Sequence, residues 1–534
     1  MCSYNAVNGV PSCANNWLLG TLLRDSWAFD GYVTSDCDAD SDVFFSHNYT
    51  KTPSEAVAVI LRAGTDVDCG YDDGFMKDYA PGALADGSIS IEDIDTVITR
   101  LYKVRIRLGT FDPPTPQSSI CISDDVCTLD AIELARDGAR QGIVLVKNTQ
   151  NTLPLTAANY SSPIVIGPNI YLSDIKSYYG PSIPCNNSNW VPLDAIKQHI
   201  AAAYGIEGVP SVSSTDVSGV PAAAAAAALA DVVFLAIGSD LELEREANDR
   251  KSIALSDAQL TLISAVTAAA NGPVIAIVQS GGAMDITPLL VNPKIKAILV
   301  CGQPSIQIVA AGDIIFGKTL DGRTVSPAAR MSQMTYPASY VDEVSEFEFS
   351  LRPGVSAWPP GTTPGRTYRF YTGNAVLPFG FGLSYTSWTY TPIPHASPLM
   401  NLAAITAATV AQAATGVVGH IAATLKETAA EFYINVTNTG NVDSDDVVLG
   451  FLIPPGAGVN GVPLKELFGF ERVFVRAGET VTVYLGAQAV RFTQADVKGT
   501  RHALGGQYMI RFGIKETNVS GLNMGYAETT FNMI

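Results

Sequence analysis

The chain has 534 residues, too many for one hydrophobic core, and 47% hydrophobic with 16% charged residues is the composition of a globular protein. We therefore expect three domains. A formal net charge of −18 argues against nucleic acids and anionic membranes as partners and favours a neutral ligand. No apolar run reaches the length of about 18 residues that a transmembrane helix needs, and no signal-peptide pattern opens the sequence.

Cysteines and glycosylation sequons bear on the compartment. The eight cysteines include no CxxC pair, and no nearby histidine cluster gives metal-ligand spacing, so we expect neither a metal nor another cofactor. An even cysteine count, few lysines and five sequons favour a secreted, oxidising setting. The sequons begin at Asn48, Asn159, Asn186, Asn435 and Asn518.

The first 112 residues alternate strand and helix signals. Two helices have amphipathic spacing, and Ser90 with Asp93 forms a capping-box pattern before a third. This alternation is typical of parallel α/β units, but only about two units fit here, whereas a (β/α)8 barrel needs about 250 residues. We expect the chain to start partway through a barrel. The predicted helices are Asn15–Trp27, Ser54–Ala63 and Ile91–Leu108, with a strand at Tyr32–Thr34.

The segment after that strand is strongly acidic. Tyr32–Thr34 reads as a short buried strand, and the following Ser-Asp36-Cys-Asp-Ala-Asp40 is too polar to continue it. A carboxylate at the carboxyl end of a strand occupies the position of catalytic residues in β/α barrels. The alternative from spacing alone is a loop of solvated aspartates.

The second predicted domain covers residues 140–335. Its last three strands read as largely continuous apolar runs, as buried parallel strands do, and they alternate with helices, which predicts an α/β sandwich. The strands are Ile143–Val146, Ile164–Ile166, Asp231–Ile237, Val274–Val278 and Ala297–Val300, and the helices include Leu129–Gly142 and Asp257–Ala270.

The remaining sequence changes character twice. Residues 336–395 are rich in Pro, Gly and aromatic residues with little periodicity, which we interpret as an ordered linker. Residues 430–530 contain short alternating strands separated by turns, which predicts a small β-sandwich. Its strands are Glu431–Asn435, Asp446–Leu452, Thr480–Leu485 and Tyr508–Phe512.

Long collinear motifs connect these regions to a known family. These motifs are Cys2–Asn15, Gly31–Ala39, Arg62–Gly70, Ala139–Asn148, Gly365–Gly373, Pro378–Thr386 and Pro463–Arg472. On these segments, and over nearly its whole length, the chain resembles the β-xylosidases of glycoside hydrolase family 3.

The resemblance implies a TIM-like (β/α)8 barrel, an α/β sandwich and a fibronectin type III-like domain. It makes Asp36 the catalytic nucleophile, and a glutamate of the segment Gly238–Arg250 the general acid/base. By its offset from Asp249 and Arg250 we match the acid/base to Glu246, with Glu244 as the alternative and a neighbour in the substrate site. Retaining glycosidases need two such carboxyls about 5 Å apart.

The same resemblance assigns Tyr4 to the sugar site, beside a disulfide between Cys37 and Cys69. A second bridge, Cys2–Cys13, closes a loop around a turn. A third bridge, Cys121–Cys127, is expected with Cys185 as the competing partner. Arg250 is interpreted as a structural ion-pair partner and Cys301 as a buried free thiol.

The implied activity is exo-acting release of xylose from the non-reducing ends of β-1,4-xylo-oligosaccharides, outside the cell. The Cys37–Cys69 bridge favours pentoses, because it would crowd the C6 hydroxymethyl group of a hexose. It does not separate xylose from arabinose, so an α-L-arabinofuranosidase or bifunctional relative stays open. An inactive fragment or a carbohydrate-binding remnant is the other alternative, since most of the barrel and its sugar-binding residues are missing from the sequence.

Overall fold

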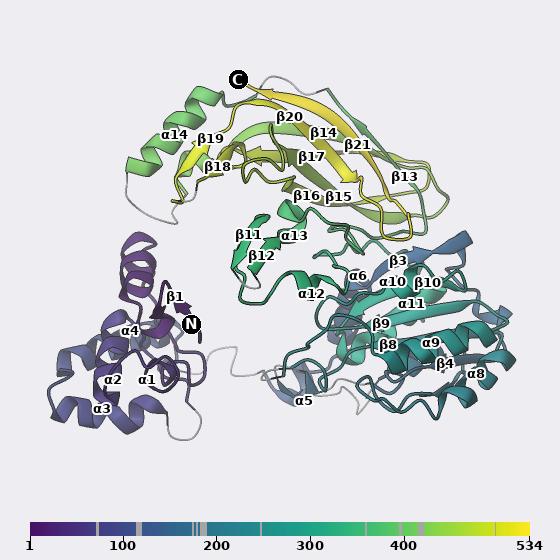
Figure 1. Cartoon of the computed structure of the whole chain (residues 1–534), viewed down its shortest axis with the longest axis horizontal. Coiled ribbons are helices and arrows are strands. Elements are labelled where there is room, and N and C mark those ends of the chain that lie inside the picture. The colour runs from purple at the N-terminus through teal and green to yellow at the C-terminus, as the bar shows by residue number, and fades with distance from the viewer. Residues whose placement is uncertain are drawn as a thin grey trace. The chain divides into compact units, whose positions relative to one another are not determined.

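The computed structural model describes residues 1–70, 74–113, 120–172, 176–177, 180–181, 190–245, 248–357, 360–394, 398–414, 421–496 and 498–534 (Figure 1). The contacts between residues divide the chain into two compact units. Unit 1 comprises Met1–Ile122, Ala407–Leu425 and Ala495–Arg501, and unit 2 comprises Ser123–Thr406, Lys426–Gln494 and His502–Ile534.

Local sequence signals define the helices of unit 1. Helix α2 begins at Pro53 after the N-cap Thr52, whose side chain accepts a hydrogen bond from the Glu55 amide, and it ends at the left-handed Gly64. The capping box of Ser90 and Asp93 forms at the start of α4, as predicted. The elements are β1 (Ala6–Val7), β2 (Val10–Pro11), a π-helical segment at Trp17–Ser26, α1 (Asp42–Phe45), α2 (Pro53–Ala63), α3 (Phe75–Ala85) and α4 (Ile91–Arg107).

Three extended segments of unit 1 lie side by side and run parallel. Cys2 bridges Ser35, and Thr34 bridges Val67, in isolated parallel pairs. The predicted strand Tyr32–Thr34 is therefore confirmed only as bridging residues, and within the described part of unit 1 this pairing does not amount to a barrel sheet. The helices nevertheless bury an apolar core around Val43, Ala56, Val57 and Ile60.

Unit 2 contains a six-stranded sheet in the order β3-β10-β9-β8-β4-β7. Strands β8, β9 and β10 are parallel, as predicted, and β4 and β7 continue the parallel set. Strand β3 pairs antiparallel to β10 at the edge of the sheet. The strands are β3 (Val144–Asn148), β4 (Pro163–Ile166), β7 (Tyr204–Ile206), β8 (Val232–Gly238), β9 (Val274–Gln279) and β10 (Ile295–Gly302).

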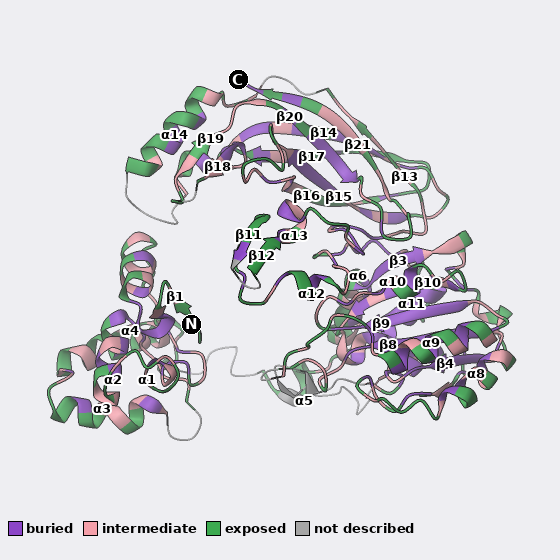
Figure 2. Cartoon of the chain, viewed as in Figure 1, coloured by how far each residue is buried: buried purple, intermediate pink, exposed green. Residues whose placement is uncertain are grey.

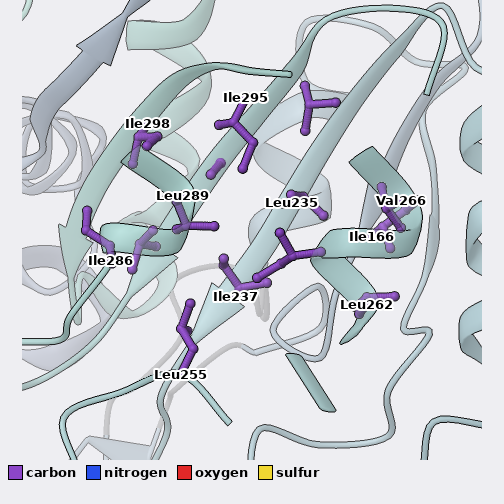
Figure 3. Close-up of a cluster of buried hydrophobic side chains, with 14 of the residues drawn as sticks. Ile166, Leu235, Ile237, Leu255, Leu262, Val266, Ile286, Leu289, Ile295 and Ile298 are labelled. Atoms are coloured by element: carbon purple, nitrogen blue, oxygen red, sulfur yellow. The ribbon is translucent and has the colours of Figure 1, made fainter. Parts of the chain in front are cut away.

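Helices cover both faces of this sheet. Leu235 and Ile237 of β8 pack with Leu262 and Val266 of α9 in one buried cluster (Figure 3). Phe234 and its same-face neighbours pack against α7 and α11 in a second cluster. The sheet is thus the middle layer of an α/β sandwich. The helices are α5 (Ile122–Asp125), α6 (Leu129–Gly142), α7 (Pro192–Lys197), α8 (Val220–Leu229), α9 (Asp257–Ala269), α10 (Thr287–Leu290) and α11 (Ala310–Phe316).

The segment predicted as a linker contains regular structure and ends inside the next domain. Its last strand, β13 (Trp388–Pro392), pairs with β14 of the β-sandwich, so the predicted linker extends too far. The elements before β13 are α12 (Tyr340–Glu343), β11 (Gly354–Ala357), β12 (Pro360–Thr363) and α13 (Thr367–Phe370).

Two antiparallel sheets form the C-terminal sandwich, in the orders β13-β14-β17 and β16-β15-β20-β21. Alternate residues of β14 are buried, as the predicted period of two requires. The strands are β14 (Thr428–Asn438), β15 (Ser444–Ile453), β16 (Glu466–Val475), β17 (Thr480–Gln488), β20 (Gly506–Ile514) and β21 (Gly525–Met533). The further elements are α14 (Leu402–Ala414), α15 (Ala423–Lys426), β18 (Thr493–Ala495) and β19 (Arg501–Ala503).

Burial differs between the two units. Strands β8 and β9 of unit 2 are buried at every position, as Figure 2 shows, and β10 is mostly buried. Helix α4 of unit 1 buries only Val97, and Leu108 beyond its end is 74% exposed. Large apolar side chains on this unit, including Trp27 and Phe111, are likewise exposed.

The cysteine predictions are confirmed in part. Cys2–Cys13 and Cys37–Cys69 are disulfides, and Cys301 is a buried free thiol whose pKa is raised by burial. The bridge Cys121–Cys127 is wrong, because Cys127 is disulfide-bonded whereas Cys121 keeps its thiol. Cys185, the competing partner, lies outside the described residues.

Candidate active site

Asp36 follows the middle one of the three parallel segments in unit 1. Its amide donates to the Cys2 carbonyl at 2.8 Å, and the Ser35 amide donates to the Val67 carbonyl at 2.8 Å. Asp36 is half-buried, and its Oδ1 accepts a hydrogen bond from the Cys37 amide at 2.9 Å. The carboxylate is therefore fixed at the carboxyl end of an extended segment, as the sequence predicts.

Tyr4, Cys37 and Cys69 lie beside Asp36. The Tyr4 hydroxyl donates to the Cys37 carbonyl at 2.6 Å, while the Tyr4 carbonyl lies 2.7 Å from His47 Nε2. The Cys37–Cys69 disulfide joins the ends of two neighbouring segments, with Cα atoms 4.3 Å apart. The structure thus brings together four residues that the sequence placed in the sugar site.

Two further carboxyl groups near Asp36, those of Asp40 and Asp68, lie close enough to interact. This interaction was not predicted from the sequence. Asp40 is fully buried, and burial, followed by the nearby Asp68 carboxylate, raises its pKa to about 6. Asp68 Oδ2 accepts a hydrogen bond from the Met76 amide at the start of α3. The loop therefore combines a half-buried carboxylate at Asp36 with a buried carboxyl group that titrates near neutral pH.

In unit 2, the acidic segment after β8 is organised around Glu244. Glu244 Oε1 accepts hydrogen bonds from the Gly281 amide at 2.7 Å and from the Ser239 hydroxyl. Its Oε2 accepts from the Gly282 amide at 3.3 Å and pairs with Arg250 Nε at 2.8 Å. Both oxygens are occupied, so Glu244 joins the loops that follow β8 and β9.

Arg250 completes this arrangement as the predicted ion-pair partner. It also donates to the Ala283 carbonyl at 3.0 Å, and its side chain is 11% exposed. A Cβ on Gly282 would lie 2.6 Å from an Arg250 nitrogen, so a side chain at this position would displace the guanidinium. The Glu244–Arg250 pair is consequently a half-buried structural feature.

Glu246, the predicted acid/base, lies outside the described residues, together with Ala247. The flanking Arg245 and Asn248 pair with each other through two backbone hydrogen bonds of 3.1 and 2.9 Å. A pocket of about 530 Å³ adjoins this segment. Its lining comprises Glu244, Arg245, Asn248, Asp249, Arg250, Ile253, Gly281, Gln303 and Glu346.

Two other features of the described residues bear on function. They contain no cluster of three or more His, Cys, Asp or Glu side chains suited to a metal ion. None of the described helices is long and apolar enough to cross a membrane.

Family models match three parts of the chain. The glycosyl hydrolase family 3 N-terminal domain matches residues 1–104, and the C-terminal domain of the same family matches residues 143–385. A fibronectin type III-like domain matches residues 446–515. The described architecture, a mixed α/β chain with a parallel sheet and a β-sandwich, agrees with these matches.

The chain is also similar to individual relatives. A probable exo-1,4-β-xylosidase of Aspergillus clavatus is 40% identical over 513 residues, which cover 93% of this chain and 62% of the relative. A β-xylosidase/α-L-arabinofuranosidase of Medicago sativa subsp. varia is 34% identical over 519 residues. These residues cover 96% of this chain and 64% of the relative.

A solved structure extends this likeness to the fold. A family 3 exo-β-xylosidase, in complex with a xylobiose aziridine activity-based probe, superposes with a TM-score of 0.83 at 30% identity. The superposition covers 100% of this chain and 65% of that one. The chain spans between 62 and 65% of the length of the curated relatives considered. Two domain models, the relatives and the shared fold together show that this chain belongs to glycosyl hydrolase family 3.

Proposed function

We propose that the chain acts in an exo-acting, retaining β-xylosidase that releases xylose from the non-reducing ends of β-1,4-xylo-oligosaccharides. The observation that carries the proposal is the Asp36 carboxylate, which is fixed at the end of a parallel segment and lies beside Tyr4 and the Cys37–Cys69 disulfide. The xylosidase names of the relatives support the same substrate class.

In the proposed first step, an Asp36 carboxylate oxygen attacks the anomeric carbon of the terminal xylose. The glycosidic C–O bond breaks as the acid/base gives its proton to the leaving oxygen. In the second step, water attacks the glycosyl-enzyme ester while the acid/base removes its proton. Xylose then leaves with the configuration of the substrate, and Asp36 returns to a carboxylate.

We assign the acid/base role to Glu246. The support comes from Glu244, whose two oxygens already accept three hydrogen bonds and pair with Arg250. A carboxyl group engaged in this way is poorly suited to deliver a proton to a leaving oxygen, because it would have to break a partly buried ion pair and its hydrogen bonds in each cycle. Glu244 then acts as the residue that positions the loop carrying Glu246.

Tyr4 and the Cys37–Cys69 bridge are proposed to contact the sugar. The disulfide adjoins the Asp36 backbone, so an added hydroxymethyl group on the sugar ring would meet a rigid wall rather than a movable side chain. We therefore expect pentosides to be preferred over hexosides. The bifunctional name of the Medicago relative supports α-L-arabinofuranoside hydrolysis as a second activity.

The domain organisation is part of the proposal. Residues 1–112 are proposed to contribute βα units to a (β/α)8 barrel, which the parallel bridges at Thr34 and Ser35 support. Residues 140–335 form the α/β sandwich, and the connection that follows ends before β13. Strand β13 and residues 430–530 belong to the fibronectin type III-like domain. The two disulfides in unit 1 support an extracellular location.

The test is the stereochemistry and selectivity of hydrolysis. Proton NMR of the reaction on an aryl β-xyloside should show β-xylose as the first product, and aryl β-glucoside should be a poorer substrate. First release of α-xylose would contradict the retaining mechanism. A preference for the glucoside would contradict the pentose assignment, and a complete lack of xyloside hydrolysis by the chain would overturn the proposal that it is catalytic.

A further inference from the structure

A second cavity of unit 2 lies apart from the Glu244 loop. It has a volume of about 670 Å³, within the range of about 300–1,000 Å³ that small-ligand sites occupy. Its walls come from the connecting segment and from the sandwich strands β15, β20 and their loops. The lining comprises Met334, Tyr368, Tyr371, Gly373, Asn374, Ala375, Pro378, Phe379, Ile453, Leu464, Lys465, Arg511, Glu516, Thr517, Asn518 and Val519.

Aromatic rings form one side of this cavity. Tyr368 and Phe379 stack with their ring centroids 4.3 Å apart, and both meet Phe451 edge to face behind them. Tyr371, a further lining residue, is held edge-on by Tyr336 and Tyr340. Rigid aromatic surfaces of this kind stack on flat apolar faces, such as the C–H face of a sugar ring.

Charged groups that balance one another form the other side. Glu516 Oε1 pairs with Lys465 Nζ at 2.8 Å and with Arg511 at 3.1 Å, and Arg511 also pairs with Glu528 at 2.8 Å. The side chains of Lys465 and Arg511 are 8% and 10% exposed. Glu516 is the one carboxylate among the charged lining residues that the structure describes, and Glu528 pairs with Arg511 from outside the cavity wall. Both lining cations are thus paired with carboxylates, so neither presents an uncompensated charge to an anion.

One hydrogen-bonding site in this cluster is unused. Glu516 Oε2 is buried and has no hydrogen-bond donor among the described residues. Burial would raise the pKa of Glu516, but Lys465 and Arg511 outweigh it and hold the pKa below its ordinary value, so the group is ionised and accepts only. A buried carboxylate oxygen without a donor is costly, and a ligand hydroxyl would supply the missing bond.

We propose that this cavity binds a neutral saccharide, as a second carbohydrate site of the chain. A vicinal diol matches the cluster, since one hydroxyl donates to Glu516 Oε2 while its neighbour accepts from Lys465. The sugar ring packs against the aromatic side formed by Tyr368, Tyr371 and Phe379. The choice of a xylo-oligosaccharide as ligand rests on the proposed function, whereas the saccharide class rests on the cavity.

The test measures xylotriose binding by calorimetry to the chain carrying Asp36→Asn, so that hydrolysis does not consume the ligand. We expect a binding event that Glu516→Gln weakens at least tenfold. Glu528→Gln is the matched control, because Glu528 pairs with the same Arg511 but does not line the cavity, and it should change affinity less than twofold. Thr517→Trp, at an exposed lining position, should block binding without touching the ion cluster.

Hydrogen exchange shows where on the chain xylotriose binds. Xylotriose should protect the peptides spanning 368–379 and 514–519, and Glu516→Gln should abolish this protection. If xylotriose protects these two peptides but the wild-type chain hydrolyses no xyloside, the proposed catalytic function is contradicted and the second binding site is supported. Binding that neither Glu516→Gln nor Thr517→Trp weakens, or the absence of protection in these peptides at saturating xylotriose, would overturn the second site.

Discussion

The loop of Asp36 and the loop of Glu244 follow strand ends in different units, and they are held by different chemistry. A disulfide and backbone hydrogen bonds fix the Asp36 loop, in a unit that leaves many apolar side chains exposed. A half-buried carboxylate with four partners fixes the Glu244 loop, on a sheet whose strands β8 and β9 are fully buried. In unit 1, whose core is small, a disulfide makes the Asp36 loop rigid. In unit 2, whose core is large, a network of hydrogen bonds and one ion pair is enough to hold the Glu244 loop.

The largest expected effect concerns Asp36 itself. Asp36→Ala should lower turnover of an aryl β-xyloside by at least about a thousandfold, because the covalent path is lost. Circular dichroism should report an unchanged fold, since the side chain accepts a hydrogen bond from the adjacent Cys37 amide and loses no long-range contact among the described residues. Wild-type turnover in this variant would remove Asp36 from the mechanism.

Removing the disulfide should destabilise the first loop and leave the second intact. The Cys37–Cys69 bridge spans 32 residues, for which the chain-entropy model gives about 3–4 kcal/mol. Cys37→Ser with Cys69→Ser should therefore increase hydrogen exchange throughout unit 1, while the strands of the α/β sheet in unit 2 keep wild-type protection. Equal loosening of both units would show that their stabilities are not separate.

The converse experiment disrupts the second loop. Glu244→Gln leaves the half-buried Arg250 charge without its counter-charge, which should lower the unfolding free energy of unit 2 by about 2 kcal/mol, between the values for exposed and buried pairs. Urea titration followed by peptide-resolved exchange measures this loss.

Glu246→Gln is the matched variant. It should leave the unfolding midpoint near that of the wild type and slow hydrolysis most for substrates with poor leaving groups, which depend on the acid. If Glu244→Gln shows this leaving-group dependence and Glu246→Gln does not, the two roles are reversed.

The smallest effect is a pH dependence confined to unit 1. Burial raises the pKa of Asp40 to about 6, above the value of about 3.9 expected in the unfolded chain, so the folded state holds this proton more tightly. The resulting stability is fully present below about pH 4 and is lost as the pH rises through 6. Unit 1 should be more stable at pH 5 than at pH 7 by about 1 kcal/mol.

Asp40→Asn supplies the control, because it removes the titrating group without changing the size of the side chain. In this variant, the stability of unit 1 measured by hydrogen exchange should be nearly the same at pH 5 and at pH 7. A stability of unit 1 that rises from pH 5 to pH 7 in the wild type would contradict the assignment.

Short-range signals predicted much of the fold. The capping box before α4 and the period of α6 gave the starts of both helices, because a helix start depends on the residues within one turn. The antiparallel pairing of β3 was not predictable, since a buried apolar run has the same pattern in either direction.

The site was predictable by residue type but not by environment. The sequence gives Asp36 and Asp40 the same polar surroundings, and only the fold buries Asp40 near Asp68. Likewise, the sequence around Glu244 does not reveal that Gly281 and Gly282, almost forty residues further along the chain, donate to its carboxylate.

A sequon illustrates the same limit. Asn518 has the spacing of a glycosylation acceptor, yet it is 2% exposed, and its side chain bonds the Val146 carbonyl and the Ser520 amide. Spacing along the chain carries no information about contacts that a residue makes across the fold.

Trapping of the glycosyl-enzyme intermediate tests the central claim most directly. A 2-deoxy-2-fluoro-β-xyloside with an activated leaving group should form a stable ester with the nucleophile, because the fluorine slows its hydrolysis more than its formation. Peptide mass spectrometry should find one adduct, on Asp36, and none in the Asp36→Ala variant. An adduct on any other carboxylate, with Asp36 unmodified, would contradict the account.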